Sequence, residues 1–303
     1  MRNKVRKEME KILIGKEQVL TKVLAAMLAG GHVLIEDVPG VGKTTLALGI
    51  ARLFDFSFKR VQFTPDVLPS DVTGFMMFDR RRNDFIYKEG AVMTNILLAD
   101  EINRASAKTQ AALLEVMEEN QVTVDSVTRE LPNPFLVLAT QNPFGYAGTQ
   151  RLPESQLDRF MIQVSIGYPS LEAEVQMYQE KQQKQSKRNP FNQADFLEMK
   201  QQVQQVEIKD CIYEYSAKIV QATRSYSDIE LGMSPRGGLA LLAMSKAWAF
   251  LNGRTFVIPE DIWDVFGVTV FHRIIWRRKG RTEDFLESLS KSIPVPKEMG
   301  GRK

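Results

Sequence analysis

Residues 33–45, VLIEDVPGVGKTT, constrain the fold of this chain more than any other stretch. They have the pattern of a buried strand, a tight glycine turn and the first turn of a helix. Backbone N–H groups at a helix start carry partial positive charge and bind anions. Gly40 and Gly42 allow the backbone to approach such a ligand closely. The pattern predicts a nucleotide phosphate loop, with Lys43 reaching the β- and γ-phosphates and the Thr44 hydroxyl ligating Mg²⁺.

One position departs from the usual G-x-x-x-x-G-K-[ST] spacing, because Asp37 stands where the first glycine belongs. On this segment alone, an ordinary strand–turn–helix junction is the alternative. The residues expected to line the phosphates are Pro39, Gly40, Val41, Gly42, Lys43, Thr44 and Thr45.

Composition excludes several classes of protein. A chain of 303 residues can form one large domain or two smaller ones, and its net charge of +3 does not indicate a nucleic-acid partner. The single cysteine, Cys211, excludes a disulfide within the chain and favours a reducing compartment. No apolar run is long enough to span a membrane, and the charged N-terminus is not a secretory signal. We therefore expect a cytoplasmic protein.

Hydrophobic patterning divides the chain near residue 168. Before it, strands and helices alternate, which predicts an α/β core with a parallel sheet and helices on both faces. After it the patterns are helical, so we expect residues 1–168 to form the core and 169–303 a smaller all-α unit with a flexible tail from 294. The expected strands are 32–37, 58–63, 95–99, 135–139 and 161–166. The expected hairpins are 74–88 and 121–131. The expected helices include 43–54, 106–119, 210–226, 234–252 and 259–276.

Acidic and amide side chains follow two of the apolar strands. Asp100 and Glu101 end one, and Asn142 comes shortly after another. Ligands of parallel sheets bind outside the carboxyl ends of the strands. Asp100 is therefore expected to orient Mg²⁺, Glu101 to polarise the attacking water, and Asn142 to bond the γ-phosphate or that water. The alternatives are two acids at an exposed strand end and a turn residue before a proline.

Two arginines are candidates for stabilising charge in a phosphoryl-transfer transition state. Arg159 lies in Leu-Asp-Arg-Phe and Arg236 in Ser-Pro-Arg-Gly. A guanidinium is suited to phosphate because it presents several fixed donors. A lone arginine is otherwise a surface residue or an ion-pair partner.

With these motifs in order, the chain resembles the MoxR-type AAA+ ATPases along nearly its whole length. The most specific segment is residues 98–105, LADEINRA. Four further segments match the family and occur in the same order along the chain. They are GGHVLIE at 30–36 leading into PGVGKT at 39–44, ATQNP at 139–143, LPESQLDRF at 152–160, and SPR at 234–236. Residues 91–94, AVMT, differ from the Gly-Pro-Val/Ile-Phe usual in this family, but they are packing positions.

The resemblance implies a P-loop AAA+ core, an α-helical lid and a set of roles. Arg159 would be an arginine finger reaching a neighbouring subunit, and Asn142 and Arg236 would be sensors 1 and 2. The hairpin at 74–88 would be the helix-2 insert, and that at 121–131 the hairpin before sensor 1. The remaining roles would be Walker A for Lys43 and Thr44, Walker B for Asp100 and Glu101, and adenine contact for Ile14 and Gly15.

The same resemblance implies a homo-oligomer, expected to be a hexameric ring that uses ATP and Mg²⁺. Relatives act as chaperone-like remodellers, and their partners often carry von Willebrand factor A domains. One alternative is a magnesium-chelatase-like motor. Another is a nucleic-acid motor, which is expected to line its pore with basic residues such as the cluster Arg80–Arg82. The third is a nucleotide-gated scaffold with little turnover. A nucleic-acid partner and a membrane span are not expected.

Overall fold

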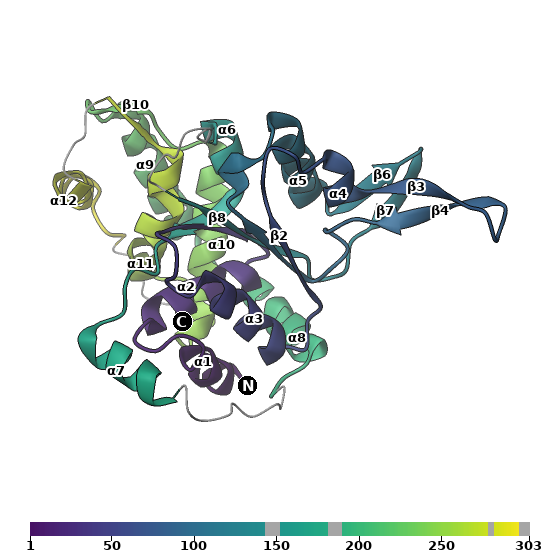
Figure 1. Ribbon diagram of the computed structural model, residues 1–303. Helices are drawn as coiled ribbons and strands as arrows, with labels where there is room; N and C mark the ends of the chain where they lie inside the picture. Colours follow the sequence, from purple (N-terminus) through teal and green to yellow (C-terminus); the bar gives the residue numbers. More distant parts are fainter. Residues whose placement is uncertain (143–151, 181–189, 278–281, 297–303) are drawn as a thin grey trace.

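A five-stranded parallel sheet organises the first half of the molecule (Figure 1). The computed structural model describes residues 1–142, 152–180, 190–277 and 282–296. In spatial order the strands are β2 (Phe58–Gln62), β5 (Ile96–Asp100), β8 (Leu136–Gln141), β1 (His32–Glu36) and β9 (Phe160–Val164). Because all the strands run in the same direction, the loops after β1, β5 and β8 meet at one edge.

Both faces of the sheet are buried at β5, β8 and β1, which explains why these strands are almost continuously apolar. Successive side chains alternate between the faces. Val33 and Ile35 belong to one hydrophobic cluster, with the helices before and after β1 and several helices of the second half. Leu34 and Val137 belong to the other, beneath helix α5. The helices that cover the sheet and join its strands are α1 (Arg2–Glu10), α2 (Glu17–Leu28), α3 (Lys43–Leu53), α4 (Pro69–Thr73), η1 (Ile102–Arg104), α5 (Ala107–Glu119) and α6 (Glu154–Leu157).

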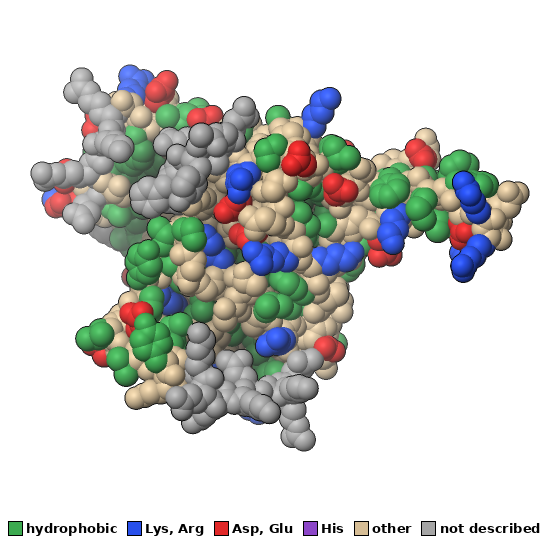
Figure 2. Space-filling view, viewed as in Figure 1, with side chains coloured by type: hydrophobic (Ala, Val, Ile, Leu, Met, Phe, Trp, Pro, Cys, Tyr) green, Lys and Arg blue, Asp and Glu red, His purple; other side chains and the backbone are tan. Residues whose placement is uncertain are grey.

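Two antiparallel hairpins extend from this core. The β3–β4 hairpin (Gly74–Asp79 and Asp84–Glu89) projects well beyond the rest of the molecule, with β6–β7 (Gln121–Val124 and Val127–Glu130) near its base (Figure 1). Figure 2 shows apolar and cationic side chains together along the projection. The exposed apolar residues there are Phe75, Met77, Phe78 and Phe85. The hairpin therefore presents a mixed surface to its surroundings.

The second half is mainly helical. Its elements are α7 (Leu171–Glu180), α8 (Gln193–Gln204), α9 (Asp210–Ser225), β10 (Ile229–Leu231), α10 (Pro235–Leu251), α11 (Pro259–Val270), η2 (Phe271–Arg273), β11 (Ile275–Trp276) and α12 (Thr282–Ser292). α10 packs against α2, and Arg2 Nη1 donates a hydrogen bond of 2.9 Å to the Phe250 carbonyl. The N-terminal helices thus join the two halves. Among the described residues, no helix is both long and apolar enough to cross a bilayer.

The predicted parallel sheet, both hairpins and most helices are confirmed. Two details differ. A helix was expected over 259–276, but α11 ends at Val270 and residues 275–276 form β11. The all-α expectation for the second unit likewise omitted the short antiparallel β10–β11 pair. The division at 168 stays a prediction, and most of the tail expected from 294 lies outside the described residues.

Candidate functional site

The loop after β1 has the conformation that its glycines predict. Gly40 and Gly42 adopt positive φ angles of 88° and 100°, and α3 begins at Lys43 directly after them. A Cβ at Gly42 would lie 2.8 Å from Leu13 Cδ2, so a side chain there would be both strained and crowded. Lys43 Nζ donates to the carbonyls of Asp37 (2.9 Å) and Val38 (3.3 Å). The ammonium group therefore lies across the loop, and Pro39, Gly40 and Thr45 are exposed beside it.

Asp37 has a structural role that the sequence analysis missed. Its buried carboxylate accepts hydrogen bonds from the backbone N–H groups of Ile166 and Gly167 and from Ser165 Oγ. Its other oxygen accepts from the N–H of Val38 (3.0 Å). The residue in the position of the missing glycine thus ties the loop to the segment after β9. Its position directly after a buried strand was the only available signal.

The segment expected to contact adenine lies beside the phosphate loop. Leu13 packs against Gly42, while a Cβ at Gly15 would lie 3.2 Å from Ala173 Cβ of α7. Ile14, between them, is half-buried. Residues 13–15 therefore lie close to both the loop and α7, and Leu13 joins the candidates that sequence reasoning named.

The acidic pair after β5 is held by a threonine of the neighbouring strand. Buried Thr140 donates from Oγ1 to Asp100 Oδ1 (2.6 Å) and accepts from the N–H of Glu101 (2.9 Å). Asp100 also pairs with Arg60 at 2.6 Å, and Glu101 with Arg104 at 2.8 Å. Thr140, Arg60 and Arg104 were not singled out from the sequence, because their roles depend on contacts between different elements or on the turn after β5.

Glu101 has a strained backbone. Its φ and ψ are 56° and 48°, in the left-handed region, which disfavours residues other than glycine by about 1–2 kcal/mol. Such outliers concentrate at functional sites, where the surrounding structure enforces them. Here the bond from the Glu101 N–H to Thr140 fixes the turn.

Strand register brings these groups to one edge. Glu36 pairs with Gln141, the N–H of Asp37 donates to the Gln141 carbonyl, and Ala99 pairs with Ala139. Asn142 follows β8 at the same edge. The structure thus gathers the loop, the two acids and Asn142, a donor set of the kind that holds a triphosphate and its Mg²⁺.

Arg159 and Arg236 lie elsewhere. Arg159 directly precedes β9, and Phe160 pairs with His32 at the amino end of β1. Arg159 Nε donates to Glu118 Oε2 (3.0 Å), and Arg236 Nη2 contacts Oε1 of the same carboxylate. These bonds lower the pKa of Glu118 and keep its carboxylate ionised, and the bond from Arg159 has the largest effect. The two arginines are brought together, but at the edge of the sheet opposite the phosphate loop.

Comparison with known proteins agrees with this geometry. A model for AAA ATPases associated with various cellular activities matches residues 32–162, and an AAA lid domain model matches 221–292. Chaperone MoxR1 of Mycobacterium tuberculosis is 37% identical over 88% of this chain and 74% of its own length. The chain belongs to the MoxR family of AAA+ ATPases. Two other relatives are Protein MoxR of Methylorubrum extorquens (24% identical; 96% and 94% covered) and YeaC of Bacillus subtilis, described as uncharacterized (46%; 94% and 92%).

A solved structure supports the same fold for this MoxR-family chain. An ATPase assigned in Cytophaga hutchinsonii superimposes with a TM-score of 0.90 at 37% identity, covering 98% of this chain and 96% of that one. AAA+ proteins bind nucleotides, typically with Mg²⁺, and ATP hydrolysis is their general activity. The family is chaperone-like, and its AAA+ members are typically oligomeric.

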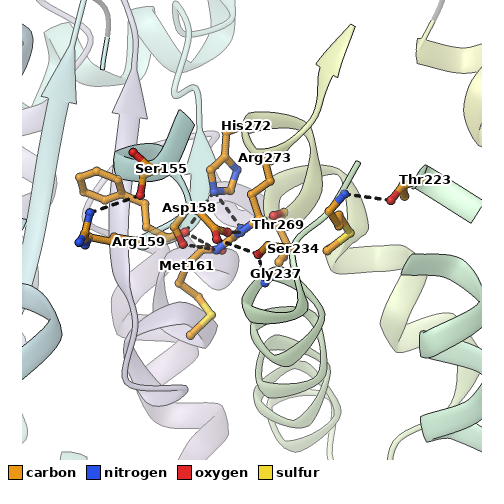
Figure 3. Close-up of polar contacts among 12 residues, drawn as sticks. Ser155, Asp158, Arg159, Met161, Thr223, Ser234, Gly237, Thr269, His272 and Arg273 are labelled. Atoms are coloured by element: carbon orange, nitrogen blue, oxygen red, sulfur yellow. Dashed lines mark hydrogen bonds and ion pairs between the residues drawn. The ribbon is translucent and has the colours of Figure 1, made fainter. Parts of the chain in front are cut away.

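A part-buried polar network around Asp158 holds the backbone next to Arg159 in this MoxR-family chain (Figure 3). Arg273 Nε donates to Asp158 Oδ1 (2.8 Å), and Ser234 Oγ donates to Asp158 Oδ2 (2.7 Å). Ser234 also caps α10 by accepting from the N–H of Gly237. Asp158 precedes Arg159, and Ser234 lies two residues before Arg236. One carboxylate therefore links the attachment points of both arginines.

Proposed function

We propose that this chain hydrolyses ATP at sites shared between neighbouring copies in a ring. The observation that carries the proposal is the position of Arg159 and Arg236. Arg159 lies beside the amino end of β1, and the phosphate loop follows its carboxyl end. The five residues of this extended strand span about 16 Å, which is the distance between the two ends. A phosphate bound to a different copy suits these arginines better than one bound to their own. Head-to-tail contacts of this kind close into rings, and six copies remain the expectation.

Within each site, the groups at the carboxyl edge have separate roles. The loop N–H groups and Lys43 bind the β- and γ-phosphates, and Thr44 and Asp100 hold Mg²⁺, which supplies charge neutralisation when bound. Glu101 orients and polarises the attacking water, while Arg104 pairs with Oε2 of the same carboxylate. Asn142 bonds the γ-phosphate or the water. Ile14 and Gly15 contact the adenine.

The hydrolysis drives chaperone-like remodelling of a partner protein in this proposal. A partner with a von Willebrand factor A domain is the best candidate, because partners of relatives often carry one. The β3–β4 hairpin suits partner contact, since it projects from the body and exposes apolar and cationic groups together (Figure 2).

The first test measures ATP turnover against protein concentration. Specific activity should rise with concentration, because the site forms only between copies. Glu101→Gln and Arg159→Ala should each lower turnover about 100-fold or more, by loss of water activation and of transition-state charge stabilisation. Concentration-independent activity that survives Arg159→Ala would reject the shared site. Negligible wild-type turnover with intact nucleotide binding would favour a nucleotide-gated scaffold.

A nucleic-acid or chelatase-like motor is the second candidate, because Arg80–Arg82 lie at the tip of the projecting hairpin. Part of this charge is offset locally, since Arg82 lies 3.8 Å from Asp79. Binding to single-stranded DNA at low and high salt decides the nucleic-acid case. Absence of binding at low salt would reject it, because phosphate contacts are strongest there.

A further inference from the structure

Glu118 lies where the two arginines meet. It belongs to the last turn of α5, and one oxygen of its carboxylate contacts Arg159 while the other contacts Arg236. Two grooves, of about 440 and 350 Å³, flank this cluster, and Glu118 and Arg159 line both of them. The Glu118 side chain is 37% exposed, so it lies at the surface and not in the core.

We propose that Glu118 is a positioning residue that holds the guanidinium groups of Arg159 and Arg236 together, so that one phosphate group of a neighbouring copy meets both. The inference rests on the shared ATPase site proposed above. It adds a residue that touches no nucleotide and acts through the two arginines.

Electrostatics explains why such a residue is needed. Two guanidinium groups at close range repel each other. A carboxylate that offers one oxygen to each group offsets the repulsion and fixes their separation. Without it, Arg159 and Arg236 would move apart and their long side chains would sample many rotamers.

The contact with Arg159 favours positioning over competition with phosphate. Glu118 engages Nε, which is set back from the tip of the side chain, while Nη1 donates to the Ser155 carbonyl at 3.3 Å. Two bonds to one planar group fix its orientation. At Arg236 the same carboxylate contacts the terminal nitrogen Nη2, so a phosphate that meets this guanidinium must use its remaining donors.

The backbone beneath Glu118 is also fixed. His32 at the start of β1 bonds the Met117 carbonyl at 3.0 Å, and Asn120 ends α5 in the left-handed conformation. On the opposite side, Asp158 joins the segment before β9 to the start of α10. The carboxylate and both arginines are thus attached to rigid parts of the molecule, as accurate positioning requires.

The test compares Glu118→Gln with Glu118→Asp and with Glu119→Gln, which makes the same charge change at the next, exposed residue. At saturating ATP, Glu118→Gln should lower kcat about tenfold or more, since small misplacements of catalytic groups have effects of this size or larger. KM and the affinity for fluorescent ADP should stay within about twofold, because Glu118 touches no nucleotide. Glu118→Asp should recover part of kcat, and Glu119→Gln should match the wild type.

A further variant separates positioning from loss of structure. Glu118→Gln added to Arg159→Ala should lower turnover less than it does alone, because the two residues act through one contact. Wild-type or faster turnover by Glu118→Gln would overturn the inference, and so would full additivity with Arg159→Ala. If Arg159→Ala itself retains full activity, the shared site fails instead. If light scattering shows that Glu118→Gln does not assemble, the kcat of Glu118→Asp decides instead. A wild-type kcat overturns the inference, and an intermediate kcat supports it.

Discussion

Asp37 stands where the general phosphate-loop pattern has its first glycine, and its contacts explain how the loop tolerates it. The carboxylate accepts hydrogen bonds from two backbone N–H groups after β9 and one before the loop turn. An acid near bound phosphates would be unfavourable if it pointed at them. Here it points away, toward Ile166 and Gly167, so it stabilises the base of the loop without facing the ligand.

Removing this carboxylate should weaken both the fold and the site. Asp37→Ala leaves the buried N–H of Ile166 and the part-buried N–H of Gly167 without an acceptor, and should lower the free energy of unfolding by about 2–3 kcal/mol. Urea denaturation measures this loss, and fluorescent ADP titration should show weaker binding in the folded variant. Asp66→Ala, which removes an exposed acid from the loop after β2, is the control and should change neither quantity. An unfolding free energy equal to wild type would contradict the role assigned to Asp37.

Some of these residues could be predicted from the sequence and others could not. Asp100 and Glu101 come at the end of one apolar strand, and Lys43 comes after the glycine turn that follows another. Parallel strands place their carboxyl ends at one edge of the sheet. Thr140 and Glu118 lie on a strand and a helix with no local signal, because their contacts join residues far apart in the chain. Sequence patterns describe neighbours along the chain, so these roles required the structure.

Among the elements, α5 connects the two functional regions. Its first turn follows the acidic pair, where Gln110 Nε2 donates to the carbonyls of Ile102 and Ala105, and its last turn carries Glu118. His32 fixes that last turn, since one ring nitrogen bonds the Met117 carbonyl and the other accepts from the Val137 N–H (3.0 Å). The neutral ring satisfies both bonds, and a charged ring would lose the second.

Stability should therefore fall in mildly acidic solution. Burial lowers the pKa of His32 to about 4 and that of His272 to about 3, from about 6.5 in the unfolded chain. As pH falls below 6.5 the unfolded chain takes up protons that the folded chain does not, so the unfolding free energy decreases. Each histidine should contribute a loss of about 2 kcal/mol between pH 7 and pH 5.

Urea unfolding of wild type and His32→Gln at both pH values checks this expectation. The variant is less stable at pH 7, but its loss on acidification should be smaller by about 2 kcal/mol. An identical loss in both proteins would show that His32 is charged in the folded chain or does not control the slope.

Elements with a clear hydrophobic pattern were predicted well. Elements that exist only because they pair with a strand far away in the chain were not. The apolar runs at β1, β5 and β8 predicted strands because both faces of the sheet are buried. Residues 275–276 follow a helical pattern in sequence, yet they pair with β10 across the second unit. Two residues carry too little periodicity to indicate that pairing.

At the scale of the whole molecule, the sheet separates two sets of groups. The phosphate loop and the acidic pair lie at its carboxyl edge, and Arg159 and Arg236 at its amino edge. In the proposed shared site, a single copy carries both halves but does not join them. Each copy should supply one half to each of its two neighbours in a ring.

Mixing two inactive variants tests this arrangement directly. Lys43→Ala lacks a working loop but retains Arg159, and Arg159→Ala has the opposite defect. In a 1:1 mixture, about a quarter of the contacts should pair an intact loop with an intact arginine, so about a quarter of wild-type turnover should return. Lys43→Ala mixed with Glu101→Gln is the matched control, because both defects lie in the same half. That mixture should stay inactive, since each loop with an intact lysine belongs to a chain without Glu101. Activity restored equally in both mixtures would contradict the division of the site, and restoration only in the first would establish that one copy completes the site of the next.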